Sequence, residues 1–178
     1  MDHSDHVNLL RPANLPLGGH WADFGAGSGA FTLALRELIG GDAIIHAVDK
    51  DRSALNQLER AYRARFGPNS KLIPLPNDFS RPMTLPALDG IVMANSLHFF
   101  KDRMKILEHV RSFLKPAGQL LIVEYNTNSG NHWVPYPFTF DVFVKLASQA
   151  GFDEPKLLTT HASSFLQGFY SAICTPLT

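Results

Sequence analysis

The stretch Trp21-Ala22-Asp23-Phe24-Gly25-Ala26-Gly27-Ser28-Gly29-Ala30 decides how this chain of 178 residues is expected to fold. Its first part is a short, mostly apolar run typical of a buried strand, and its second part is a loop with three glycines. Glycines let the backbone turn tightly and come close to a ligand, and such loops lie at the binding edge of open parallel sheets. The stretch therefore predicts a strand, a binding loop and a helix in succession.

Outward from this stretch, short apolar strands alternate with amphipathic helices, which indicates an open, mostly parallel α/β sheet with helices on both faces. The helix after Asp102 is expected to include Phe113 and Leu114 in its apolar stripe and to be broken by residues 115–118. The last two strands are expected to form a hairpin. We expect strands at 20–24, 43–48, 71–75, 91–94, 119–123, 156–160 and 169–175, and helices at 28–39 and after Asp51, Asp102 and Thr139.

Composition narrows the class of protein. Hydrophobic residues make up 45% of the chain, so a core can be buried. Lys plus Arg and Asp plus Glu number 16 each, and this balance argues against a dedicated nucleic-acid-binding protein. The chain has one cysteine, Cys174, no apolar run long enough to span a membrane, and a polar N-terminus unlike a secretory signal. We expect a soluble, cytoplasmic protein with no membrane segment.

The glycine loop allows two interpretations. Gly25-x-Gly27-x-x-Ala30 matches the fingerprint of dinucleotide-binding domains, with Asp49 further along. The same loop is also Asp-x-Gly-x-Gly-x-Gly, beginning at Asp23. A carboxylate at Asp23 would repel the pyrophosphate of a dinucleotide, whereas it would attract a ligand that carries an amino group and a sulfonium. Asp49, at the end of the second strand, can accept both hydroxyls of a ribose in either case.

The second interpretation resembles motif I of the class I methyltransferases that depend on S-adenosylmethionine (SAM). Asn77-Asp78-Phe79 after the third strand resembles the adenine pocket of that family, with an acid for the exocyclic amine and a ring for the base. Residues 88–99 resemble its fourth-strand motif. Residues 114–124 resemble its L-x-P-G-G-x-L motif, with Ala117 in place of the first glycine. Together with Asp49 after the second strand, these make five motifs in the family's order.

The resemblance implies a three-layer Rossmann-like fold whose seven-stranded sheet has an antiparallel C-terminal strand. It implies a methyltransferase domain over residues 20–178, preceded by a segment, residues 1–19, that can fold over the cofactor as a lid. SAM is the implied cofactor, S-adenosylhomocysteine the product and a small molecule with an O, N or C nucleophile the substrate. The implied cofactor-binding residues are Asp23, Gly25, Ala26, Gly27, Gly29, Asp49, Lys50, Asp78, Phe79, Asn95 and Ser96.

Residues that follow the fourth and fifth strands are candidates for the substrate side. His98 is the first candidate for a general base, and Glu124 or His132 the second, if the acceptor is a hydroxyl. A hydrogen-bonded packing histidine is the alternative for His98. The proline-rich loop near residues 131–137 suits a substrate wall. The substrate-side candidates are His98, Glu124, Tyr125, His132, Trp133 and Tyr136.

Two other classes remain open: a nicotinamide oxidoreductase and a non-catalytic SAM-binding module. A base-modifying enzyme is disfavoured because Asn95-Ser96-Leu97-His98 stands where such enzymes carry Asn/Asp-Pro-Pro-Tyr. His3 and His6 have the spacing of metal ligands on a helix, but no third ligand is near them in the sequence. We therefore expect no metal site and interpret this end of the chain as a mobile terminus.

Overall fold

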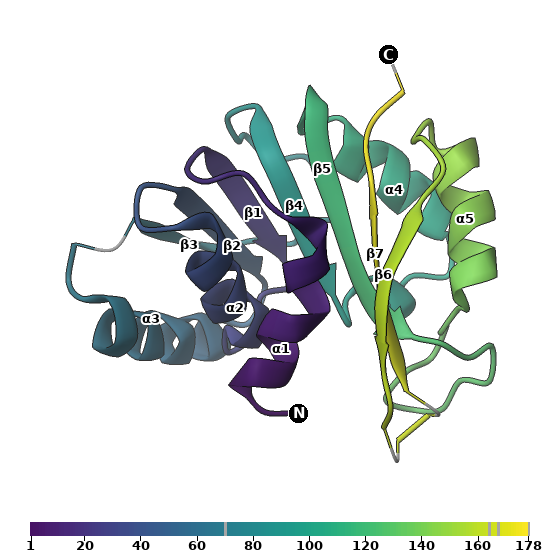
Figure 1. Cartoon of the computed structure of the whole chain (residues 1–178), viewed down its shortest axis with the longest axis horizontal. Helices are drawn as coiled ribbons and strands as arrows, with labels where there is room; N and C mark the ends of the chain where they lie inside the picture. Colours follow the sequence, from purple (N-terminus) through teal and green to yellow (C-terminus); the bar gives the residue numbers. More distant parts are fainter. Residues whose placement is uncertain (70, 164, 167, 178) are drawn as a thin grey trace.

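A seven-stranded sheet forms the centre of the computed structural model, which describes residues 1–69, 71–163, 165–166 and 168–177 (Figure 1). The strand order is β3-β2-β1-β4-β5-β7-β6. The strands from β3 to β5 in this order are parallel, and β7 is antiparallel to β5 and β6, which confirms the predicted topology and the C-terminal hairpin. The strands are β1 His20–Phe24, β2 Ile44–Asp49, β3 Leu72–Pro76, β4 Leu88–Ala94, β5 Leu114–Tyr125, β6 Lys156–His161 and β7 Phe169–Cys174.

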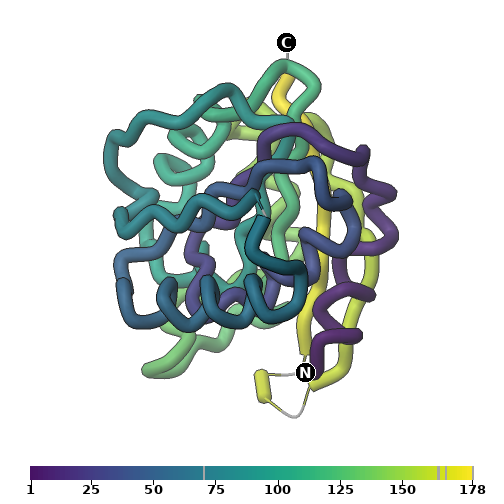
Figure 2. Tube along the Cα trace, turned by 90° about the vertical axis from the view of Figure 1, so that its left-hand side faces the viewer, coloured from purple at the N-terminus to yellow at the C-terminus, as the bar shows by residue number. Residues whose placement is uncertain are grey.

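Helices cover both faces of this sheet and make three layers (Figures 1 and 2). One face carries α1 His3–Leu10, α2 Ala30–Ile39 and α3 Arg52–Phe66, and the other carries α4 Arg103–Arg111 and α5 Phe140–Gln149. Short 3-10 helices, η1 Arg11–Ala13 and η2 Leu97–Phe99, follow α1 and β4. The structure confirms the predicted three-layer α/β class.

Alternate residues of the central strands contribute to opposite layers. In β1, Trp21 packs in the core cluster with α1 and α2, whereas Ala22 packs in the cluster with α4 and α5. In β4, Val92 and its neighbour Ile91 divide in the same way. Because side chains of a strand alternate between its faces, a sheet covered on both sides needs near-continuous apolar strands. This is why the strand runs in the sequence lack a polar alternation.

Polar residues begin two of the helices as predicted. The carboxylate of Asp51 accepts hydrogen bonds from the backbone N–H groups of Ser53 and Ala54 at the start of α3, at 2.8 and 3.1 Å. Asp102 accepts one from Lys105 at the start of α4. Thr139 stands at the N-cap of α5, where the helix was predicted to begin, but its side chain makes no capping hydrogen bond.

The chain from α4 into β5 differs from the sequence-based expectation. α4 ends at Arg111, and Leu114 is already the first residue of β5, so Phe113 and Leu114 are not helical. Residues 115–118, expected as a break, lie inside a strand of 12 residues. The backbone N–H of Leu88 donates to Phe113 O, and the register between β4 and β5 is irregular before Gly90. Pairing with β4 thus extends the strand across Pro116.

The N-terminal residues form a docked helix, so the interpretation as a mobile terminus is wrong. Asp2 and Asp5 make a reciprocal capping box at the start of α1. Val7, Leu9 and Leu10 are buried in the core cluster that α1 shares with α2. α1 also lies beside β6 (Figure 2). The burial of three apolar side chains supplies the free energy that orders this segment.

None of the helices in the described part of the chain is both long and apolar enough to cross a membrane.

Close packing at Gly90 gives a test of this architecture. A Cβ atom at Gly90 would overlap the ring of Trp21, which is fully buried. We expect Gly90→Ala to lower the free energy of unfolding by about 1–3 kcal/mol, because overpacking forces side chains from their rotamers. Gly41→Ala is the matched control, since a Cβ there meets no atom within 4 Å, and its effect should stay within about 0.5 kcal/mol. Urea denaturation measures both, and equal effects would contradict this packing.

Candidate functional site: a cleft at the carboxyl ends of the strands

Two adjoining cavities lie where β1 to β4 end. The larger is about 500 Å³ and is lined by Gly25, Asp49, Lys50, Asn77, Asp78, Phe79, Asn95, Ser96, Phe99 and Phe100. The smaller is about 180 Å³ and is lined by His6, Asp23, Gly25, Ala26, Ser28, Ala30, Phe31, Ala94 and Asn95. Gly25 and Asn95 line both cavities, so the two form one cleft. Its size is that of a small-molecule site.

The glycine loop forms the floor between the two cavities. Gly25 has φ +84°, a conformation that favours glycine, and a Cβ there would overlap the side chain of Ser96. The N–H groups of Gly25 and Ala26 donate to Val48 O, which ties the loop to the end of β2. The loop therefore packs closely against the ends of β2 and β4, and a side chain at Gly25 would prevent this approach.

Asp49 holds the tip of this loop. Its Oδ2 accepts a hydrogen bond from Gly27 N–H at 2.8 Å, and its Oδ1 accepts one from Asp51 N–H at 2.9 Å. Each carboxylate oxygen has two lone pairs, so Asp49 can still accept hydroxyl donors from a ligand in the larger cavity. The sequence placed Asp49 at the ribose position but gave no sign of its bond to Gly27.

Asp23 is the buried acid of the smaller cavity. The side chain is 1% exposed, and Oδ2 accepts a hydrogen bond from the Thr32 hydroxyl at 2.6 Å. The pKa of Asp23 is raised to about 7, mainly by burial; the Thr32 hydrogen bond lowers it and the charge of Asp49 raises it. A cation that enters the cavity would favour the ionised form of this carboxyl group and form an ion pair with it.

The far wall of the larger cavity combines an acid with stacked rings. Phe79 is 7% exposed and lies parallel to Phe24 at 5.4 Å between ring centroids, with Phe100 edge-on at the same distance. Asp78 accepts from the N–H and hydroxyl of Ser80 at 3.0 and 2.6 Å. The Ser80 bonds lower the pKa of Asp78, and the charges of Arg81 and Lys50 add to this shift. Asp78 thus both starts a turn and presents a carboxylate to the cavity.

Two polar groups after β4 point to a ligand. Asn95 has φ +53°, in the left-handed region that asparagine tolerates better than most residues. Asn95 Oδ1 and Ser96 Oγ are buried and have no hydrogen-bond partner among the described residues. Buried polar atoms are seldom left unpaired, so these two are suited to bonds with a bound molecule.

His98 and Glu124 form a buried pair beneath the cleft. His98 Nδ1 lies 2.7 Å from Glu124 Oε2, and the side chains are 3% and 0% exposed. Glu124 Oε1 accepts from the N–H groups of Leu97 and His98, at 3.0 and 3.2 Å. Glu124 therefore anchors η2, which carries the cleft residue Phe99. Neither member of the pair lines the two cavities.

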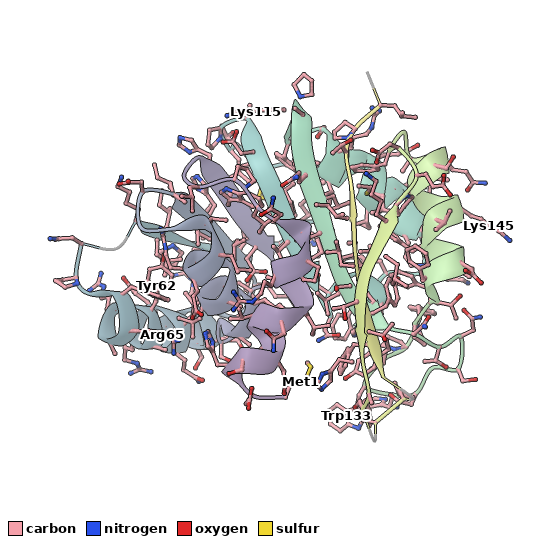
Figure 3. All side chains as sticks on the ribbon, viewed as in Figure 1. Met1, Tyr62, Arg65, Lys115, Trp133 and Lys145 are labelled. Carbon is pink, nitrogen blue, oxygen red and sulfur yellow. The ribbon has the colours of Figure 1, made fainter. Side chains whose placement is uncertain are left out.

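The other substrate-side candidates are Tyr125 in β5 and three residues of the loop before α5. Tyr125 packs on Phe169 with 4.3 Å between centroids. The loop that carries His132 and Trp133 is held to η2, because Tyr136 N–H donates to His98 O at 3.0 Å. Trp133 is 74% exposed and lies with Met1 at the same end of the molecule (Figure 3). None of these four candidates lines either cavity.

Several lining residues were missed by the sequence-based reasoning. His6 reaches the smaller cavity from α1, and only the interpretation of 1–19 as a lid hinted at it. Phe99 and Phe100 line the larger cavity. Two consecutive aromatic residues directly after a strand motif were the available signal. Gly27 and Gly29, by contrast, line neither cavity and contribute through their backbone. Gly29 is the N-cap residue of α2, with φ +96°.

A doubly wound sheet with a glycine loop and acids at successive strand ends defines the class of proteins that bind a nucleoside-containing cofactor at the sheet edge. Within that class, the model of a methyltransferase domain matches residues 22–120. The chain belongs to this methyltransferase-domain family, whose methyl donor is SAM. A search of curated proteins found no match.

Solved structures of methyltransferases share the fold. A protein assigned as an O-methyltransferase from Nostoc punctiforme has 19% identity and a TM-score of 0.77, with 97% of this chain and 56% of that chain covered. YcgJ from Bacillus subtilis has 11% identity and a TM-score of 0.77 over 99% and 100%. Human N-acetylserotonin methyltransferase, solved with SAM, has 18% identity and a TM-score of 0.73 over 98% and 52%. The chain thus spans about half the length of two of these structures.

The residues of the cleft fit SAM. The large cavity offers rings for a base and the Asp49 carboxylate for hydroxyls, and the small cavity offers Asp23 for a cation. Asn95 lines both cavities, and its unpartnered Oδ1 can accept a hydrogen bond from a bound ligand. In the described part of the chain, no three His, Cys, Asp or Glu side chains gather as metal ligands.

The Glu124 pair predicts a stability effect. Glu124→Ala would leave His98 and two backbone N–H groups without their buried acceptor. We expect a loss of about 3 kcal/mol in the free energy of unfolding. Glu124→Gln keeps an acceptor oxygen and should lose less. Urea denaturation measures both variants, and a neutral Glu124→Ala would show that the pair does not hold η2.

Proposed function

We propose that the protein is a SAM-dependent methyltransferase whose acceptor is a small molecule. The single observation that carries the proposal is the cleft, whose smaller cavity is lined by the buried acid Asp23 and whose larger cavity is lined by Asp49 and the ring of Phe79, groups that suit the amino group, the ribose and the base of SAM. The family match and the shared fold support the same reaction class.

Each residue of the cleft then has a task. Asp23 binds the amino group, Asp49 accepts the ribose hydroxyls, and Phe79 with Asp78 binds the adenine. The backbone of Gly25, Ala26, Gly27 and Gly29 keeps the loop narrow, with Lys50 at its rim and Asn95 and Ser96 near the reacting centre. SAM supplies a methyl group that is already activated by its sulfonium. The protein mainly positions the acceptor and excludes water.

His98 is the proposed general base for a hydroxyl acceptor. Glu124 Oε2 accepts a hydrogen bond from Nδ1–H, so the lone pair of the neutral ring lies on Nε2. As the acceptor oxygen bonds to the methyl carbon, the carbon–sulfur bond would break and S-adenosylhomocysteine would leave with the electron pair, while the hydroxyl proton passes to Nε2. Glu124 stabilises the resulting imidazolium as a positioning residue. Tyr125, His132, Trp133 and Tyr136 form the proposed substrate side, beyond the cofactor cavities.

Two further assignments complete the proposal. Residues 1–19 act as a lid, since α1 brings His6 to the edge of the cleft. We also propose a cytoplasmic location, because the one cysteine, Cys174, is buried in β7 and is not available for a disulfide. The balanced charge of the chain supports a small-molecule acceptor rather than a nucleic acid.

Binding of the product tests the cofactor assignment. S-adenosylhomocysteine at 100 times its dissociation constant should raise the stability of the folded protein by about 2.7 kcal/mol, seen as a rise in melting temperature. Asp49→Ala should weaken this binding at least about tenfold, because it removes the hydroxyl acceptor and releases Gly27. Asp42→Ala is the matched control, since Asp42 is a fully exposed acid away from the cleft. Stabilisation by NADH instead would contradict the proposal.

His98→Gln tests the base. Glutamine can still donate to Glu124 but cannot take a proton, so S-adenosylhomocysteine formation from hydroxyl acceptors should fall by about 10²–10⁴. Binding of S-adenosylhomocysteine should not change. His109→Gln on α4 is the control histidine. An unchanged rate in His98→Gln across a panel of phenols, alcohols and amines would leave His98 as a packing residue that holds η2.

A further inference from the structure

The smaller cavity has a charge pattern of its own. Asp23 is the one acid among its lining residues, and its buried carboxyl suits an ammonium group. Under the proposed function this cavity receives the amino-acid tail of SAM, which carries a carboxylate beside the ammonium. The carboxylate would be repelled by Asp23 and needs a donor elsewhere in the cavity.

His6 is the one lining side chain that can carry a positive charge. The other polar lining side chains besides Asp23 are Ser28 and Asn95, which are neutral. His6 comes from α1, so it faces the loop after β1 from outside the sheet. Its ring is half-buried and stands edge-on to Phe31, with centroids 4.9 Å apart. This contact fixes the ring at the rim of the cavity.

The helix that carries His6 is held at several points. His3 Nε2 lies 2.9 Å from Glu37 Oε2 on α2, and Arg65 Nη2 on α3 lies 3.0 Å from the same oxygen. Val7 on the next turn is 2% exposed. His6 therefore has a defined place before any ligand binds. Burial lowers the pKa of His6, the charges of the N-terminus and His3 lower it further, and those of Asp5 and Asp2 oppose the shift. The imidazole N–H can donate to a carboxylate in either protonation state.

We propose that His6 binds the carboxylate of the amino-acid tail of SAM and thereby couples the docking of α1 to cofactor binding. The inference rests on the proposed function and adds the residue that recognises this end of the ligand. A ligand that contacts α1 only when α1 is docked stabilises the docked state by its differential affinity. The N-terminal segment is thus part of the binding site and not merely a cover.

Ligands that differ in one group test this proposal. Decarboxylated SAM keeps the amino group and the nucleoside but lacks the carboxylate. Calorimetric titration of the whole chain should show that His6→Ala weakens SAM at least about tenfold, the usual effect of losing a charged hydrogen bond. The same variant should bind decarboxylated SAM within about twofold of wild type, because the contact is absent there. His6→Gln, which retains a donor, should lie between wild type and His6→Ala for SAM.

His3→Ala is the matched control on the same helix. It removes a partly exposed contact to Glu37 while the buried Val7, Leu9 and Leu10 keep α1 docked, so SAM and decarboxylated SAM should each bind this variant within about twofold of wild type. Equal weakening of both ligands by His6→Ala, or no weakening of either, would overturn the role of His6 while leaving the proposed function intact. Failure of wild type to bind SAM and 5′-methylthioadenosine alike would instead refute the proposed function. Circular dichroism of each variant establishes that it is folded.

Discussion

The hydrogen bond from Gly27 N–H to Asp49 Oδ2 is the constraint on which the cleft depends. It joins the loop after β1 to the end of β2 and leaves the loop open toward the ligand side. The hydrogen bonds from the N–H groups of Gly25 and Ala26 to Val48 O also hold this loop to the end of β2. A parallel sheet brings these strand ends to one edge, so acids that are 26 residues apart in the sequence come to share one cleft.

Two kinds of element form the cleft: the ends of the sheet strands, and the N-terminal helix α1 that packs beside them. The buried strands β1 and β2 supply Asp23 and Asp49 at their ends, and the turn after the edge strand β3 supplies the ring of Phe79. Glu124 extends this rigidity to η2, because its carboxylate holds two backbone N–H groups and the ring of His98 at once. α1, by contrast, reaches the cleft from the N-terminus and depends on Val7, Leu9 and Leu10 for its position. A site built in this way has a fixed nucleoside end and an amino-acid end that can respond to the ligand.

Much of the fold could be predicted because local signals and global packing agree in this chain. Glycines mark helix ends, Asp51 and Asp102 mark helix starts, and continuous apolar runs mark strands covered on both faces. The errors arose where tertiary pairing decides: the pairing of Leu114 and Gln119 with β4 places residues 115–118 inside β5, and α1 is ordered by its packing against α2 and β6. Of the site, the strand-end acids followed from parallel topology. The reach of His6 into the cavity depends on how two helices cross, which no spacing in the sequence encodes.

The ionisation of Asp23 offers the most direct measurement. Its raised pKa, about 7, means that the carboxyl group is largely protonated at pH 6 in the free protein. Binding an ammonium group favours the carboxylate, so S-adenosylhomocysteine should release protons on binding at pH 6. Calorimetric titrations in buffers of different ionisation enthalpy should detect this release, and Asp23→Asn should abolish it. No binding, or binding without proton release in the wild-type protein, would contradict the account of the cleft as the site of a nucleoside that carries an ammonium group.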